Sequence, residues 1–281
     1  FGTSGPYAHF KCMDMVAQAA AGAFSITGEP DGPPMRPGPT MGDAGTGVQA
    51  ALAISAAYAQ KLKTGEGQLI ELSMQEAMTY YLRTAVSRTR FGQVATPRTG
   101  NGENPFVSLY PCAPGGPNDY VFVMAVNPRM WSAVCCALGQ PELLSDPRFS
   151  TAQARHENRH LLFEEIGSWT RSHTKKECMS ALAEEGVCAS QVYETNELFT
   201  DPHLVERDFV HDVEHAVHGK VQLLGWPARM SKSHVAIEAA PLLGEHTDEV
   251  LAEDLGLSAE DIDELRTEGS IGSEMIKGSR S

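Results

Sequence analysis

MGDAGTG, at residues 41–47, stands directly before an alanine-rich segment that ends in TGEGQ at residues 64–68. Its glycines leave the backbone around Asp43 without side chains, so a substrate can approach this carboxylate closely. The simpler interpretation is that Asp43 is a helix cap, because aspartate is among the best N-cap residues. The pattern predicts a helix over residues 44–63 and leaves two roles open for Asp43, a cap or a nucleophile.

The composition is that of a globular protein. Of the 281 residues, 42% are hydrophobic and 21% are charged, which excludes a disordered chain. The formal net charge of −14 makes nucleic acids and anionic membranes poor partners. The longest apolar stretch, residues 48–59, is too short and too rich in alanine to span a bilayer. Six cysteines without a C-x-x-C pair indicate reduced thiols in a cytoplasmic protein.

Hydrophobic periodicity and turn residues predict helices alternating with short strands. Loops rich in glycine and proline are expected at residues 28–39 and 90–105. The polar tail from Gly269 is expected to fray. The predicted helices cover residues 14–23, 44–63, 74–88, 130–138, 147–170, 174–185 and 258–267, and the predicted strands cover 68–72, 120–126, 187–193 and a hairpin at 209–226.

An ordered set of motifs runs through the whole chain and resembles the class III CoA-transferases of the CaiB/BaiF type, which include formyl-CoA transferase. The C-terminal half carries DPRF at 146–149, PLLGEHT at 241–247 and LGL at 255–257. Each piece is weak by itself, but their common order makes the set specific. The N-terminal half carries GPY at 5–7, VAQ at 16–18, TGEPDGPP at 27–34, GD at 42–43 and KTGEGQ at 63–68.

The resemblance implies an activity and a set of site residues. Members transfer CoA from an acyl-CoA thioester to a free carboxylic acid, and the catalytic residue corresponds to Asp43. Lys11 and Met74 match positions that contact CoA, and Met13 stands where some members have tyrosine. No cofactor is implied, since the CoA thioester is itself a substrate. The active-site loop corresponds to Gly100, Asn101 and Gly102.

The implied fold is α/β, with a Rossmann-like large domain interrupted by a smaller α/β domain. Residues 1–88 would form part of the large domain, residues 89–205 the small domain, and residues 206–281 a C-terminal segment that returns to the large domain. Members assemble as interlocked homodimers. The chain begins at Phe1 without a methionine, and we expect that the N-terminal part of the large domain is missing.

The chemistry explains why an aspartate suits this position. Exchange of CoA between a thioester and an acid needs a group that can accept the acyl group and release it again. Covalent catalysis by Asp43 would supply this group and divide one difficult step into easier ones. Backbone N–H groups at the start of the helix are expected to stabilise the oxyanions. A mobile cover at Gly100–Gly102 is expected to exclude water, because the intermediates would otherwise hydrolyse.

Three alternatives remain open. An α-methylacyl-CoA racemase, from the same family, uses a His/Asp pair, but its histidine falls at Met13, beside Asp14, and methionine carries no proton. A non-catalytic subunit or fragment is the second alternative, and the unbroken Gly42-Asp43 motif argues against it. A metal site is the third, but the spacing of the histidines at 203, 211, 215 and 218 fits no zinc pattern, so no metal is expected.

Overall fold

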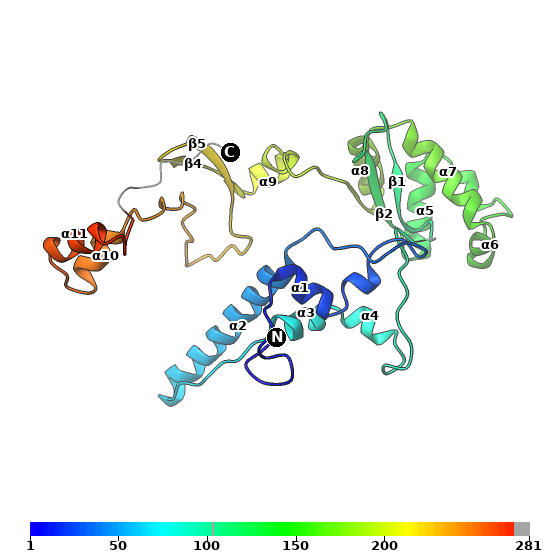
Figure 1. Ribbon diagram of the computed structural model, residues 1–281. Coiled ribbons are helices and arrows are strands. Elements are labelled where there is room, and N and C mark those ends of the chain that lie inside the picture. The colour runs from blue at the N-terminus through cyan, green and yellow to red at the C-terminus, as the bar shows by residue number, and fades with distance from the viewer. Residues whose placement is uncertain (103, 273–281) are drawn as a thin grey trace. The chain divides into compact units, whose positions relative to one another are not determined.

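The computed structural model describes residues 1–102 and 104–272 (Figure 1). The chain forms two compact units, residues 1–192 and 193–281. The mixture of helices and sheets confirms the predicted α/β composition. Both sheets are antiparallel within the described residues, so the Rossmann-like parallel sheet remains a prediction. The predicted division into domains at residues 88 and 205 also remains a prediction.

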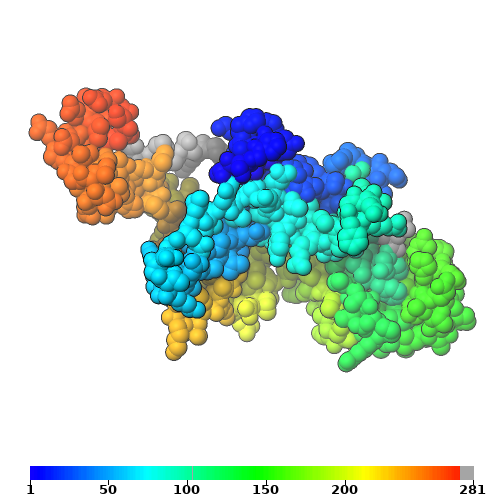
Figure 2. Space-filling model, turned by 90° about the horizontal axis from the view of Figure 1, so that it is seen from below, coloured from blue at the N-terminus to red at the C-terminus, as the bar shows by residue number. Residues whose placement is uncertain are grey.

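The N-terminal part of the first unit is a small helical group. Helices α1, α2 and α3 contact one another around a cluster of Ala17, Ala23 and Met78. The atoms of α2 and α3, blue to cyan, form one continuous surface in the space-filling view (Figure 2). The elements are α1 (Asp14–Ala20), the 3-10 helix η1 (Phe24–Ile26), α2 (Met41–Thr64), α3 (Met74–Tyr81) and α4 (Arg83–Ser87).

Helix α2 departs from the sequence prediction at its start. It begins at Met41, and Thr40 takes the N-cap position without a side-chain cap bond. Asp43 therefore lies inside the first turn, and the interpretation of Asp43 as a cap is wrong. The far end agrees with the sequence, because Gly65 adopts the left-handed conformation with φ 79° and ends the helix.

Residues 68–72 do not form the predicted strand. They are an extended segment between α2 and α3, and Leu69 is 91% exposed. A strand exists only where a neighbouring strand accepts and donates its backbone hydrogen bonds. Alternating apolar residues indicate which face would be buried, but they do not supply the partner.

The second part of the first unit is built on a three-stranded antiparallel sheet in the order β1-β2-β3, formed by β1 (Val107–Pro111), β2 (Tyr120–Met124) and β3 (Cys188–Gln191). Val121 and Val123 are buried and alternate with exposed Phe122 and Met124, as a sheet with one covered face requires. The sequence did not identify β1, because its buried face carries Ser108 beside an aromatic residue and shows no clean apolar alternation.

Helices pack against this sheet and enclose the main core. Helix α7 contacts β1, and α8 contacts β2 and β3. The helices are α5 (Pro128–Ala137), η2 (Pro141–Leu144), α6 (Ala152–Glu157), α7 (Arg159–Arg171) and α8 (Lys175–Glu184). The most buried core residues are Tyr110, Cys112, Val121, Val123, Val134, Cys135, Phe149, Leu162, Ile166, Cys178 and Leu182.

The single helix predicted over residues 147–170 is wrong, since two helices occupy this region. Asn158 separates α6 from α7, and its Nδ2 donates to the carbonyls of Ala154 and Arg148 at 3.0 and 3.2 Å. Side chains such as asparagine compete with the helix for backbone groups. The predicted capping box of α8 is confirmed, because Thr174 and Glu177 exchange side-chain and backbone hydrogen bonds.

The second unit contains the predicted hairpin and helices. Strands β4 (Val210–His215) and β5 (Gly219–Leu224) pair in antiparallel register, as predicted around Gly219. The predicted cap Ser258 forms a capping box with Asp261. The expectation of a frayed tail falls largely on residues 273–281, outside the described residues. The helices are η3 (Glu197–Phe199), α9 (Pro202–Glu206), α10 (Thr247–Glu253) and α11 (Ala259–Thr267).

Within the described residues there is neither a membrane-spanning helix nor a disulfide. Among residues 1–102 and 104–272, no helix combines the length and apolar character that a bilayer crossing demands. All six cysteines are free thiols. The sulfur atoms of Cys112 and Cys178 lie 3.7 Å apart, and burial raises the pKa of both thiols.

The core of the sheet part should determine the stability of the first unit. We expect Leu162→Ala to lower the free energy of unfolding by about 2–5 kcal/mol, because it removes a fully buried side chain and leaves a cavity. Urea unfolding followed by circular dichroism measures this loss. Leu144→Ala, at a more exposed leucine, is the control and should change stability by about 0.5 kcal/mol or less. Equal losses in both variants would contradict this account of the core.

Candidate active site

Asp43 lies in the first turn of α2, where that helix meets the start of α1. Its side chain is exposed to solvent. Its backbone N–H, in contrast, is hydrogen-bonded within the protein and donates to Oδ1 of Asp14 at 3.1 Å. Asp14 is in the first turn of α1. The structure thus holds the main chain of Asp43 firmly and leaves its carboxylate accessible.

Asp14 is the residue that sequence reasoning missed, and it is 9% exposed. Its second oxygen, Oδ2, accepts a hydrogen bond of 3.0 Å from Nε2 of Gln18, one turn further along α1. Gln18 is also buried, and the same nitrogen donates to the carbonyl of Pro39 at 3.0 Å. Asp14 and Gln18 therefore connect α1 to the loop before α2 and to the first turn of α2. The spacing of four residues between them is the signal that could have found the pair.

Glycine is required at position 42 by the close approach of α1. A Cβ atom there would lie 2.6 Å from the carbonyl oxygen of Asp14 and 2.7 Å from its Oδ1. A similar approach occurs one turn later, where a Cβ at Gly45 would lie 2.7 Å from the ring of Tyr81. The hydroxyl of Tyr81 donates to the carbonyl of Gly45 at 3.0 Å. These two glycines are the residues of α2 that are buried.

The expected oxyanion site at the start of α2 is largely occupied by internal hydrogen bonds. The N–H of Met41 donates to Pro39 at 2.9 Å, and that of Ala44 donates to Thr40 at 3.0 Å. The N–H of Asp43 is bound to Asp14. These three groups do not point freely toward a substrate, so the expectation that they stabilise oxyanions loses its support.

The predicted CoA-contacting residues separate into two settings. Lys11 and Met13 are exposed on the segment that enters α1, and Met13 is directly followed by Asp14, so both lie beside the junction that holds Asp43. Met74 begins α3, is only partly exposed and packs against the small apolar cluster of the three helices. Their roles in binding CoA stay predictions.

The loop with Gly100, Asn101 and Gly102 is fastened to the proline-rich loop rather than free. The N–H of Gly100 donates to the carbonyl of Gly28 at 3.0 Å. A Cβ at Gly100, whose φ is 51°, would lie 2.5 Å from Oε2 of Glu29. Both glycines of this loop have positive φ, which favours glycine. The role of this loop at the active site stays a prediction.

Arg98 reinforces the attachment of that loop. Its guanidinium donates to three backbone carbonyls, that of Ser25 in η1 at 3.4 Å and those of Glu29 and Gly32 in the proline-rich loop at 3.2 and 2.6 Å. A planar guanidinium with five donors is well suited to collecting several carbonyls. The loop that begins at Arg98 is therefore anchored at its base.

No metal-binding geometry is present among residues 1–102 and 104–272, where no three His, Cys, Asp or Glu side chains are grouped to hold an ion. In the hairpin, Nδ1 of His215 instead accepts hydrogen bonds from the N–H groups of Val217 and His218, at 3.1 and 3.2 Å.

Comparison with known proteins identifies the family. The model of CoA-transferase family III matches residues 1–247. A formyl-CoA:oxalate CoA-transferase of Streptomyces coelicolor is 36% identical over 95% of this chain and 68% of its own length. A protein of the same name from Escherichia coli is 33% identical over 96% of this chain and 70% of its own length. The chain therefore belongs to CoA-transferase family III, and the family and enzyme class predicted from the sequence are confirmed.

Solved structures agree with this assignment. A CaiB/BaiF family protein from Brucella suis matches with a TM-score of 0.75 and 28% identity, over 90% of this chain and 65% of its own. The protein Rv3272 from M. tuberculosis matches with a TM-score of 0.70 and 21% identity, over 88% of this chain and 66% of its own, and shows the shared fold. The chain thus spans about two thirds of the length of the proteins that it matches.

Two glycines of α2 provide a test of the junction. We expect Gly42→Ala to lower the free energy of unfolding by about 1–3 kcal/mol, because its methyl group forces α1 away from α2. Gly47→Ala is the matched control, since nothing lies within 4 Å of its Cβ position, and in a helix interior alanine should stabilise by up to about 1 kcal/mol. Urea unfolding of both variants measures the difference. Changes of the same sign would refute the close contact at Gly42.

Proposed function

We propose that this chain carries the catalytic aspartate of a CoA-transferase, which moves CoA from an acyl-CoA thioester to a free carboxylic acid through a covalent intermediate on Asp43. The observation that carries the proposal is the junction of α1 and α2. There, a buried carboxylate holds the backbone of Asp43 while the side chain of Asp43 stays exposed, in a chain that belongs to family III.

The first half of the reaction releases the donor acid. A carboxylate oxygen of Asp43 attacks the thioester carbonyl, the C–S bond breaks, and CoA leaves as its thiolate, which gives a mixed anhydride. The thiolate then attacks the Asp43 carbonyl of that anhydride. The C–O bond on the aspartyl side breaks, the donor acid departs as its carboxylate, and Asp43 is left as a thioester with CoA.

The second half repeats these steps in reverse order. The acceptor carboxylate attacks the aspartyl thioester, expels CoA thiolate and forms a second anhydride. The thiolate then attacks the acyl carbon of the acceptor, which yields the new acyl-CoA and restores the carboxylate of Asp43. Each step exchanges one acyl bond for another, so no cofactor and no metal are needed in this scheme. CoA enters and leaves only as a substrate.

The fixed main chain of Asp43 suits this sequence of attacks. The Asp43 carbonyl must be reached twice, by the thiolate and by the acceptor, so its carbon should keep one position throughout. The hydrogen bond from Asp43 to Asp14 and the contact at Gly42 restrict that position. Proximity of this kind lowers the barrier because the orientation is fixed before reaction.

The acids exchanged are proposed from the relatives. Several of them are named formyl-CoA:oxalate CoA-transferase, so formyl-CoA and oxalate are the first donor and acceptor to test. Lys11 is the cation exposed beside the junction, and we propose that it meets a phosphate of CoA. Met13 is 76% exposed at the same place and would contact the substrate.

The nucleophile can be tested directly. We expect Asp43→Asn to reduce CoA transfer by at least about a thousandfold, since the amide cannot form the anhydride. The variant should keep the wild-type unfolding midpoint. Asp31→Asn, at an exposed aspartate of the proline-rich loop, is the matched control and should keep full activity. The measurement is acyl-CoA exchange by mass spectrometry, with the full-length protein and a panel of donors that includes formyl-CoA.

A hydroxylamine trap identifies the intermediate in the same reactions. A hydroxamate on Asp43 is expected with the wild type and with Asp31→Asn, and is absent with Asp43→Asn. Full transfer by Asp43→Asn would disprove the nucleophile. Exchange of the α-proton of the acyl group with solvent, without a hydroxamate, would instead indicate racemase chemistry.

We also propose that the protein is a homodimer, and an open face of α2 supports this. Val48, Leu52, Tyr58 and Leu62 are exposed. At 100° per residue they fall within about one third of the circumference of α2, and Leu52, seven residues after Gly45, lies at the edge nearest that glycine. Exposed apolar faces of this kind mark interaction surfaces.

The oligomeric state tests this proposal. We expect a mass of twice the chain in sedimentation at micromolar concentration. Tyr58→Asp should shift the protein toward the monomer, because a charge in an apolar interface is costly. Gln60→Asp lies on the opposite side of α2 and should leave the mass unchanged. A monomeric wild type at micromolar concentration would rule out the stable dimer.

A further inference from the structure

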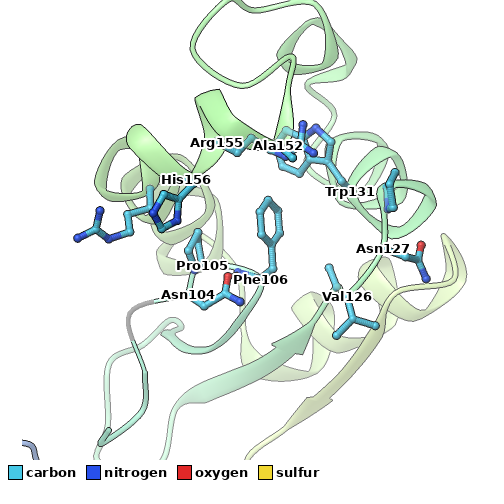
Figure 3. Close-up of a pocket in the computed structure, with 12 residues that line it drawn as sticks. Asn104, Pro105, Phe106, Val126, Asn127, Trp131, Ala152, Arg155 and His156 are labelled. Carbon is cyan, nitrogen blue, oxygen red and sulfur yellow. Dashed lines mark hydrogen bonds between the residues drawn. The ribbon is translucent and has the colours of Figure 1, made fainter.

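A second site candidate lies in the sheet part of the first unit and shares no residue with the Asp43 junction. A cavity of about 720 Å³ opens where the chain leaves β2 and enters α5, opposite α6 and the first residue of α7 (Figure 3). This volume lies inside the range of about 300–1,000 Å³ that is typical of small-molecule sites. The cavity is therefore large enough for a compact organic ligand.

Aromatic side chains form the inner wall of the cavity. Phe106 and Trp131 meet edge to face with ring centroids 5.5 Å apart. Both rings belong to the core of this part of the protein, so their positions are fixed by packing rather than by a ligand. Such a wall offers a rigid apolar surface that favours a flat or aliphatic group.

A cation is held against that wall. The guanidinium carbon of Arg155 lies 5.6 Å from the ring centre of Trp131 and 5.9 Å from that of Phe106. Its Nη1 donates to the carbonyl of Phe149 at 2.7 Å, which fixes the plane of the group. A guanidinium has five N–H donors, so further donors remain for a ligand. Desolvation lowers the pKa of Arg155, which also marks a charge partly withdrawn from water.

The charged side chains among the described residues that line the cavity are all arginines. Arg159 and His156 also line it, and none of the described lining residues is Asp or Glu. This is unusual in a chain with a formal net charge of −14. A concave site lined by two arginines favours an anionic ligand.

One buried donor in the cavity wall lacks a partner. Among the described residues, the indole Nε1 of Trp131 is the buried side-chain polar atom without a hydrogen bond, and the residue is 4% exposed. Buried indole N–H groups usually find an acceptor. This N–H is enclosed by protein atoms, so it reports on changes in the cavity wall.

We propose that this cavity binds a small aryl carboxylate. The ring packs against Phe106 and Trp131, and the carboxylate accepts hydrogen bonds from Arg155. A small molecule fits the concave shape better than a protein surface does. The inference does not depend on the proposed transferase activity, because none of these residues belongs to the Asp43 junction.

The test uses the indole N–H signals of the 15N-labelled full chain. Its three tryptophans, Trp131, Trp169 and Trp226, give three such signals, and Trp131→Phe assigns the relevant one. The probes are 3-phenylpropanoate and its neutral amide, which share size and shape. We expect the carboxylate to shift the Trp131 signal saturably, and the amide to bind at least about tenfold more weakly because it lacks the charge.

Arginine variants locate the anion. Arg155→Gln should lower the affinity for 3-phenylpropanoate at least about tenfold. The urea unfolding midpoint of this variant shows whether it is folded. If it is not, Arg159→Gln, which should also weaken binding, replaces it. Arg171→Gln removes the same charge from the other end of α7 and should bind as the wild type does. No shift at millimolar carboxylate, equal binding of the amide, or equal weakening in Arg171→Gln would overturn the proposal.

Discussion

The hydrogen bond from the backbone of Asp43 to the buried carboxylate of Asp14 is the interaction on which the proposed site depends. It joins two helices whose first turns are 29 residues apart in sequence. The bond forms only because Gly42 lets the backbone of α2 approach α1, at a distance where any side chain would collide. The position of the proposed nucleophile thus depends on the missing side chain of Gly42 and on the buried carboxylate of Asp14.

The same junction explains how a long helix with little buried surface keeps its direction. Helix α2 buries only Gly42 and Gly45 among its residues, so ordinary apolar packing contributes little to holding it. Close backbone contact with α1 and the hydrogen bond from Tyr81 take the place of that packing. The remaining faces of α2 are open to another surface.

Local signals in the sequence predicted local structure well. Two kinds of feature are as expected, the capping boxes at Thr174 and Ser258 and the hairpin around Gly219. Each depends on residues that lie close together in the sequence. The failures share a different cause. Residues 68–72 lack a partner strand within the described residues, and the helix over residues 147–170 is divided by the hydrogen bonds of Asn158. Both depend on where other backbone groups lie.

The sequence by itself determined the family, the position of Asp43 as the candidate nucleophile and the need for bare backbone around it, since ordered motifs and glycine spacing are properties of the chain alone. Only the tertiary structure decided that Asp43 lies inside the first turn of α2, that Asp14 and Gln18 hold it, and that Arg155 and Trp131 meet in one cavity. These relations depend on side chains from separate elements meeting in space, and no pattern along the chain encodes such a meeting directly.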